Sequence, residues 1–213
     1  MTNLIERLQF FSETDRLKSI SRANWVRGEE RFETVGEHVW HATLLAMIFA
    51  DAAPEGTDHN RVRDLLTVHD LVEVYAGDVP IWDQKDGDGM EDREMAAGAR
   101  LTALLPDDVR GGIDQLWREF QAQETVESRF ARAIDALHPM IVSWYPPAIG
   151  HARAAHINPT AIIERKSPLI RPLPALWQVA EWLIVQAVRQ GFIVEDDASR
   201  AIARELENHG PRT

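Results

Sequence analysis

The sequence contains no cysteine among its 213 residues. Disulfides, thiolate zinc sites and cysteine nucleophiles are therefore excluded, and any bound metal has to be held by nitrogen and oxygen atoms. Positive charge is also scarce, because 23 Lys and Arg face 34 Asp and Glu and leave a net charge of -11. This deficit argues against binding to duplex nucleic acid, although one or two arginines could still hold a small phosphorylated metabolite.

Long hydrophobic runs are absent as well. The closest approach to a membrane span, residues 39–53, falls short of the roughly 18 residues that a span requires and contains His41. The N-terminal segment mixes charged with apolar residues and lacks the basic-then-apolar layout of a secretory signal. We therefore expect a soluble, cytoplasmic protein that does not bind a membrane.

Apolar residues recur at helical spacing through almost the whole chain, which predicts an all-α fold. The length favours a single domain over residues 1–213. Thr34 and Glu37 match a capping box at the start of one helix, and Gly77 is a stop signal for the next. Start and stop signals of this kind predict helices at 39–50, 60–76, 92–105, 107–123, 127–145, 174–190 and 196–208. Residues 145–159, rich in proline, read as an irregular excursion.

Several tryptophans lie at helical apolar spacing and are predicted to be core residues, among them Trp117, Trp144, Trp177 and Trp182. The last two belong to an apolar stripe over residues 174–192. Such a stripe could instead pack against a second copy of the chain, because large apolar patches commonly mark interfaces and twofold dimers are the usual result. We therefore expect a homodimer.

The adjacent pair His69-Asp70 is the most informative local feature, because it lies with Glu73 inside an otherwise apolar helical stretch. Burying unpaired charge costs several kcal/mol, so such groups neutralise, pair or coordinate a metal. Pointing Asp70 and Glu73 into a closed interior would raise at least one carboxyl pKa unless a cation or an arginine lay between them. A buried His-carboxylate network and an acidic edge turned toward solvent are the alternatives that this pair alone leaves open.

Two further ionisable residues lie among hydrophobic neighbours. His38 falls in the first turn of the helix that follows the capping box, and Asp135 lies in an apolar helical pattern. Pro139, four residues after Asp135, has no amide hydrogen to donate to the Asp135 carbonyl and loosens the helix there. Two imidazoles and two carboxylates in apolar surroundings favour a metal site.

These residues resemble the H…HD…D signature of the HD-domain metal-dependent phosphohydrolases. The strings E-T-V-G-E-H at 33–38, H-D-L-V-E-V-Y-A-G-D at 69–78 and F-A-R-A-I-D-A-L at 130–137 are similar to those of the 5′-deoxynucleotidase (YfbR-like) branch. The similarity covers a core of roughly residues 14–145. It implies a single-domain helical HD-domain bundle, with C-terminal helices at 160–208 packing on that core.

The resemblance also implies the site and its chemistry. One divalent transition metal (Mn, Co, Fe, Ni or Zn) would be held by four residues: His38, His69, Asp70 and Asp135. A metal-activated water would release phosphate from (deoxy)nucleoside 5′-monophosphates, which makes the protein a phosphoric monoester hydrolase. Glu73 and Asp78 would be the catalytic carboxyl groups beside the phosphate. Arg22 matches the family arginine that contacts the phosphate, and Trp25 would meet the nucleoside.

Two stretches depart from the pattern of this branch. Ala23 follows Arg22 where the branch has tryptophan, and the aromatic residue comes only at Trp25. Residues 79–85 read V-P-I-W-D-Q-K in place of L-P-T-P-V-K. Both stretches lie where the nucleoside is expected, so the preference for deoxyribose, and for nucleotides at all, stays open.

Two other functions are kept as alternatives. The first is an HD-fold dinuclear phosphodiesterase or oxygenase, in which His41 and His138 would help to bind a second metal; more often, such residues are outer partners of the ligands. Further histidines are available only in loop-like surroundings: His59, His151 and His156. The second alternative is a non-catalytic helical interaction protein in which the metal only fastens helices together.

Overall fold

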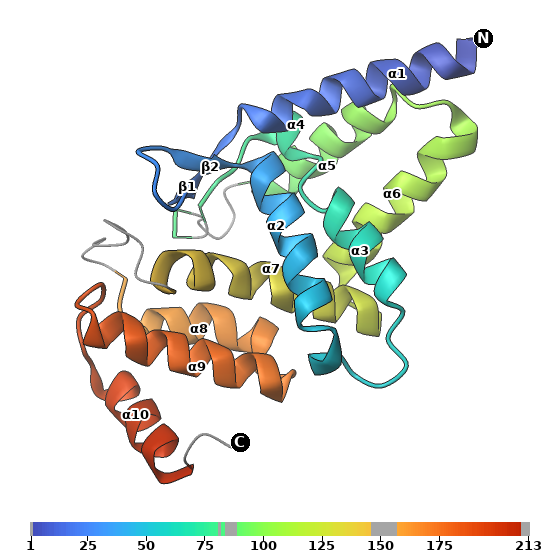
Figure 1. Cartoon of the computed structure of the whole chain (residues 1–213). Coiled ribbons are helices and arrows are strands. Elements are labelled where there is room, and N and C mark those ends of the chain that lie inside the picture. Colours follow the sequence, from blue (N-terminus) through green and yellow to red (C-terminus); the bar gives the residue numbers. More distant parts are fainter. Residues whose placement is uncertain (1, 81, 84–88, 146–156, 210–213) are drawn as a thin grey trace.

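Helix α7, Val126–Trp144, lies at the centre of the molecule and buries many of its side chains (Figure 1). The structure is a computed structural model that describes residues 2–80, 82–83, 89–145 and 157–209. The side chain of Thr125 accepts a hydrogen bond from the Ser128 amide and starts α7, and Phe130 and Ile134 are among the side chains that it buries completely. Helices α2, α3 and α6 contact α7, and so do α8 and α9.

The remaining elements are mostly helical, which confirms the predicted fold class. The chain begins with α1 (Thr2–Thr14), a 3₁₀ turn η1 (Asp15–Lys18) and the strands β1 (Ser21–Trp25) and β2 (Phe32–Thr34). It continues with α2 (Val35–Ile48), the 3₁₀ turn η2 (Ala50–Ala52), α3 (His59–Val68), α4 (Glu73–Ala76), α5 (Met90–Thr102) and α6 (Asp107–Ala122). After α7 come α8 (Pro159–Ile170), α9 (Pro174–Arg189) and α10 (Asp197–His209).

The short hairpin β1–β2, which the sequence patterns did not predict, leads directly into α2. The strands pair antiparallel, with Ser21 opposite Thr34 and Trp25 opposite Phe32. Thr34 ends β2 and caps α2 through the predicted capping box with Glu37. Because strand and helix share this residue, the hairpin is held beside the first turn of α2.

The predicted single helix over residues 60–76 is wrong, because the structure ends α3 at Val68 and begins α4 at Glu73. The His69 Nδ1 atom lies 2.7 Å from the Leu66 carbonyl oxygen and donates a hydrogen bond to it. In a regular α-helix that carbonyl would accept from the amide of residue 70. The backbone tightens instead into i→i−3 bonds, such as the one from the Glu73 amide to the Asp70 carbonyl. Gly77 then ends α4 as predicted, with a φ of +75°.

Most of the predicted core tryptophans are buried, but Trp182 is not. Trp117, Trp144 and Trp177 are 4–8% exposed, whereas Trp182 is 40% exposed and packs its ring against Tyr145. The 174–192 stripe also differs from the expected dimer surface, because most of its large apolar side chains lie inside this chain. The predicted excursion at 145–159 falls largely outside the described residues.

Apolar side chains from α2, α3 and α6 to α10 join in one large cluster, and those of α4 and α5 belong to two smaller ones. The large cluster agrees with a single domain, although the number of domains stays a prediction. Within the described part of the chain, no helix has both the length and the apolar character that a membrane crossing demands.

We predict that Thr34→Ala lowers the free energy of unfolding by about 1 kcal/mol and the Tm by about 2 to 4 °C, because the cap of α2 is lost. Thermal unfolding followed by circular dichroism measures this change. Thr67→Ala is the matched control, because Thr67 is exposed within α3 and caps no helix. Equal Tm values for the two variants would contradict the prediction.

Candidate metal centre and active site

The four predicted metal ligands come from three elements and converge. His38 lies in the first turn of α2, His69 and Asp70 lie in the turn after α3, and Asp135 lies in α7. The His38 Nε2 atom is 3.1 Å from Asp135 Oδ1 and 3.6 Å from Asp70 Oδ2. The His69 Nε2 atom is 3.1 Å from Asp70 Oδ2 and 3.5 Å from Asp135 Oδ1. Donor atoms distant in sequence therefore surround one point.

The chemistry of these donors fits a divalent cation. Because His69 Nδ1 donates to a backbone carbonyl, the Nε2 atom of the neutral imidazole would present a lone pair toward the carboxylates. This Nε2 atom is buried and has no aligned hydrogen-bond partner in the structure. A lone pair facing two carboxylates is repulsive without a positive charge between them, and mixed imidazole and carboxylate ligation suits a transition metal.

The pKa values show the same imbalance of charge. Burial acts to lower the pKa of His69, but the carboxylates of Asp70 and Asp135 outweigh it and raise that pKa to about 10. Burial raises the pKa of Glu73 to about 9, assisted by the negative charges of Asp70 and Asp78. Burial also raises the pKa of Asp78. The site therefore retains protons at neutral pH unless a cation neutralises it.

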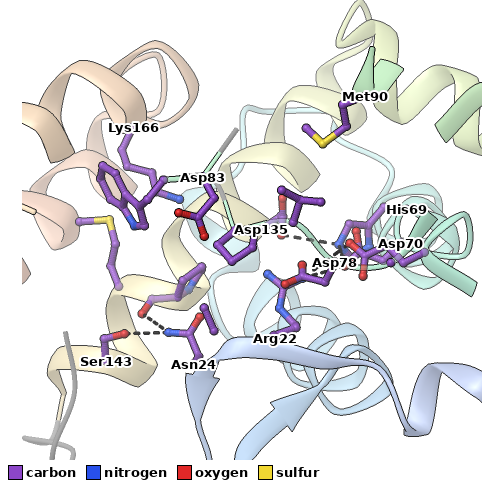
Figure 2. Close-up of a pocket in the computed structure, with 18 of the residues that line it drawn as sticks. Arg22, Asn24, His69, Asp70, Asp78, Asp83, Met90, Asp135, Ser143 and Lys166 are labelled. Atoms are coloured by element: carbon purple, nitrogen blue, oxygen red, sulfur yellow. Dashed lines mark hydrogen bonds and ion pairs between the residues drawn. The ribbon is translucent and has the colours of Figure 1, made fainter. Parts of the chain in front are cut away.

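Arg22 connects the ligand cluster with the two further acids, Glu73 and Asp78. Its Nη1 atom lies 3.2 Å from Asp70 Oδ2, 3.2 Å from Asp78 Oδ1 and 4.0 Å from Glu73 Oε1. Figure 2 shows the guanidinium rising from β1 beside Asp78, on the side of the cavity where Asp70 lies. Arg132 Nη1 lies 3.5 Å from Asp135 Oδ2, so two guanidinium groups face four carboxyl groups, and the remaining positive charge has to come from bound protons or a metal.

A cavity of about 470 Å³ opens beside this cluster. The predicted site residues Arg22, Trp25, His69, Asp70, Glu73, Asp78 and Asp135 line it, as does Ala23. At the far end in Figure 2, Asn24 donates to Ser143 Oγ at 2.7 Å, and Lys166 enters from α8. The sequence patterns did not point to Asn24, Ser143 or Lys166, although Lys166 interrupts an apolar helical pattern that could have revealed it.

Two other histidines extend the site away from the cavity. His38 Nδ1 lies 3.1 Å from His138 Nδ1, and His138 Nε2 lies 3.0 Å from His41 Nδ1. If His38 and His138 each donate outward, His38 Nε2 is left with a lone pair toward Asp135. These contacts favour the outer-partner role of His41 and His138 over a second metal. His59 is the first residue of α3 and lies about 15 Å from His69 along the helix axis, too far to join the site.

Glu33, to which no sequence pattern pointed, also lies at the site. It is buried at 6% exposure, and its Oε1 atom lies 3.5 Å from Arg22 Nε and 4.0 Å from His38 Nδ1. Glu33, His38 and His138 could also group around a cation, because their donor atoms lie within 4.8 Å of one another. Arg22 already supplies positive charge there, so we assign Glu33 to fixing the guanidinium.

Known proteins resemble this chain in both sequence and fold. A family model described as an HD domain matches residues 14–177, which is more than half of the chain. The chain belongs to the HD domain family. A solved structure described as a predicted metal-dependent phosphohydrolase, from Magnetospirillum magnetotacticum, is 33% identical, with a TM-score of 0.82. The match covers 92% of this HD domain protein and 100% of that chain.

Two further proteins are also similar to this chain. The human protein named 5′-deoxynucleotidase HDDC2 is 32% identical over 129 residues, which are 60% of this chain and 62% of the human protein. The chain thus spans less than two thirds of the length of this relative. An HD-domain phosphohydrolase from Listeria innocua is 14% identical, with a TM-score of 0.57. The match covers 96% of this chain and 99% of that chain, and it supports the fold alone.

We predict that Mn²⁺ or Co²⁺ raises the Tm of the metal-stripped protein by about 5 to 10 °C at saturating concentration, because only the folded chain assembles the ligands. Asp135→Asn removes most of this gain. Asp51→Asn, at an exposed position, is the control and retains it. If the metal does not change the Tm of the unchanged protein, the assignment of the ligands is refuted.

Proposed function

We propose that this HD domain protein is a phosphoric monoester hydrolase that releases phosphate from nucleoside 5′-monophosphates with the help of one divalent metal. The main support is that the ligand cluster, Arg22 and two carboxyl groups of raised pKa share one wall of a cavity. A metal that only fastened helices would need neither the acids nor the cavity. The name of the human relative agrees with this activity.

The four clustered side chains, His38, His69, Asp70 and Asp135, are the proposed metal ligands. A bound Mn, Fe, Co, Ni or Zn ion would polarise a phosphoryl oxygen and lower the pKa of a coordinated water. Four protein ligands also leave room in an octahedron for solvent and substrate. The choice among these metals is left to metal analysis of the purified protein.

The remaining residues handle the phosphate and the protons. Arg22 offsets the negative charge of the phosphoryl oxygens while water attacks the phosphorus and the bond from phosphorus to the 5′ oxygen breaks. Glu73 orients the water or accepts its proton, and Asp78 assists protonation of the leaving 5′ alkoxide. A raised pKa suits an acid that donates a proton, and the two roles could also be exchanged between these residues.

The nucleoside would lie against the two stretches that depart from the branch pattern. Ala23, Trp25, Val79 and Trp82 all line the cavity beyond Arg22. Deoxyribonucleoside and ribonucleoside 5′-monophosphates, assayed side by side with bis-phosphodiesters and an aryl phosphate, decide the sugar preference and test the phosphodiesterase alternative. We expect monoesters to be the substrates.

We predict that Glu73→Gln lowers kcat by about 10²- to 10⁴-fold while metal content stays unchanged, because a proton-handling group is lost and the ligands remain. Asp70→Ala, in contrast, loses activity together with the metal. Phosphate release and elemental analysis of the same samples measure both quantities.

Glu55→Gln is the matched control, because Glu55 is exposed and lies in the turn before α3. Undiminished turnover in Asp70→Ala would place the chemistry elsewhere. Retained metal without turnover of any phosphoester by the unchanged protein would favour the interaction-protein alternative.

A homodimer and a cytoplasmic location are two further proposals. The dimer cannot use most of the 174–192 stripe, but α1 exposes large apolar side chains: Leu4, Leu8 and Phe11 are 64–75% exposed. Sedimentation at micromolar concentration is expected to give twice the 24.1 kDa mass of the chain. A uniform species at the mass of one chain would contradict the dimer.

A further inference from the structure

Lys166 is a charged residue on the apolar face of α8. Ile162, Lys166 and Ile170 follow one another at intervals of four residues, so they share one face of the helix. Both isoleucines are completely buried, and Lys166 is only 6% exposed. Lysine is almost never buried without a partner, and such a conflict between local pattern and charge commonly marks a functional position.

The ammonium group of Lys166 points into the cavity. Figure 2 shows its nitrogen directed toward the centre of the pocket, on the side opposite His69 and Asp70. The structure gives Lys166 no hydrogen bond or ion pair with any residue it describes. Burial lowers its pKa to about 8, which leaves the group largely protonated at neutral pH. A buried donor without an acceptor in the protein is available to a ligand.

The surroundings of Lys166 fit a flat, uncharged group. Trp82, Trp144, Met140 and Ile162 line the same cavity as Lys166, and Ile162 lies one turn before it in α8. Aromatic and aliphatic walls with a few polar groups are typical of sites that bind ring systems. Carboxylates such as Asp83 line the cavity as well, which disfavours a second anionic group there.

We propose that Lys166 is a specificity-determining residue, which donates a hydrogen bond to an acceptor atom on the nucleobase while the phosphate lies at Arg22. This inference rests on the proposed function, because it takes the substrate to be a nucleotide. An ammonium group is a donor only, so it recognises carbonyl oxygens and ring nitrogens of the base.

The test is Lys166→Met, which keeps the apolar stem and removes the charge. Two substrates are compared: thymidine 5′-monophosphate, and 2-deoxyribose 5-phosphate, which has no base. The ratio of kcat/KM for the nucleotide to that for the sugar phosphate is expected to fall about tenfold or more, because a hydrogen bond to a charged group is lost. Lys18→Met, at an exposed lysine, is the matched control.

Binding of thymidine, measured by isothermal titration, separates this inference from the hydrolase proposal, because thymidine has no phosphate to lose. We expect its Kd to rise about tenfold in Lys166→Met. Weakened thymidine binding would uphold the role of Lys166 even if the unchanged protein hydrolysed no monoester, and only the proposed function would then fail. An unchanged Kd, or an equal loss of kcat/KM for both substrates, would overturn the role of Lys166.

Thermal unfolding distinguishes recognition from a structural role. Because Lys166→Met removes an unpartnered buried charge, its Tm is expected to rise by a few degrees while discrimination falls. A lower Tm with unchanged discrimination would make Lys166 structural. The unchanged protein could instead prefer thymidine 3′,5′-bisphosphate to the monophosphate and lose that preference in Lys166→Met. This result would mean that Lys166 binds an anion, and it would also overturn the proposal.

Discussion

An excess of buried negative charge is the constraint on which this site depends. Asp70, Glu73, Asp78 and Asp135 lie within one region of low exposure, where Arg22 faces the first three and Arg132 faces Asp135. Isolated buried carboxylates would neutralise by taking up protons, which the raised pKa of Glu73 already shows. A divalent cation bound by the two imidazoles would neutralise part of this negative charge and, in our proposal, would activate the water that attacks the phosphate.

Interruptions of regular structure bring these charges together. The HD turn stops α3 before its pattern ends, because the His69 imidazole takes the Leu66 carbonyl that the helix needs. The hairpin β1–β2 carries Arg22 to the same point, and the capping box at Thr34 fixes the hairpin next to His38. Helix α7 supplies the remaining ligand, Asp135. The local breaks are thus the parts of the fold that build the site.

Much of the helical framework could be predicted from sequence, because long amphipathic helices and the Thr34 capping box are local signals. The convergence of His38, His69-Asp70 and Asp135 followed from their shared apolar surroundings and the family resemblance. The break at His69 could not be predicted from periodicity, since it depends on a side-chain hydrogen bond. The hairpin was missed because its strands are too short to show alternation, and Trp182 shows that apolar spacing alone does not ensure burial.

The position of the cation is the most direct test of this account. Diffraction data from crystals grown with Mn²⁺ or Co²⁺, collected at the absorption edge of the metal, locate the ion by its anomalous signal. We expect one strong peak within coordination distance of His38 Nε2, His69 Nε2, Asp70 and Asp135. A peak elsewhere, or side chains at this cluster that turn away from one another around an empty centre, would contradict the account.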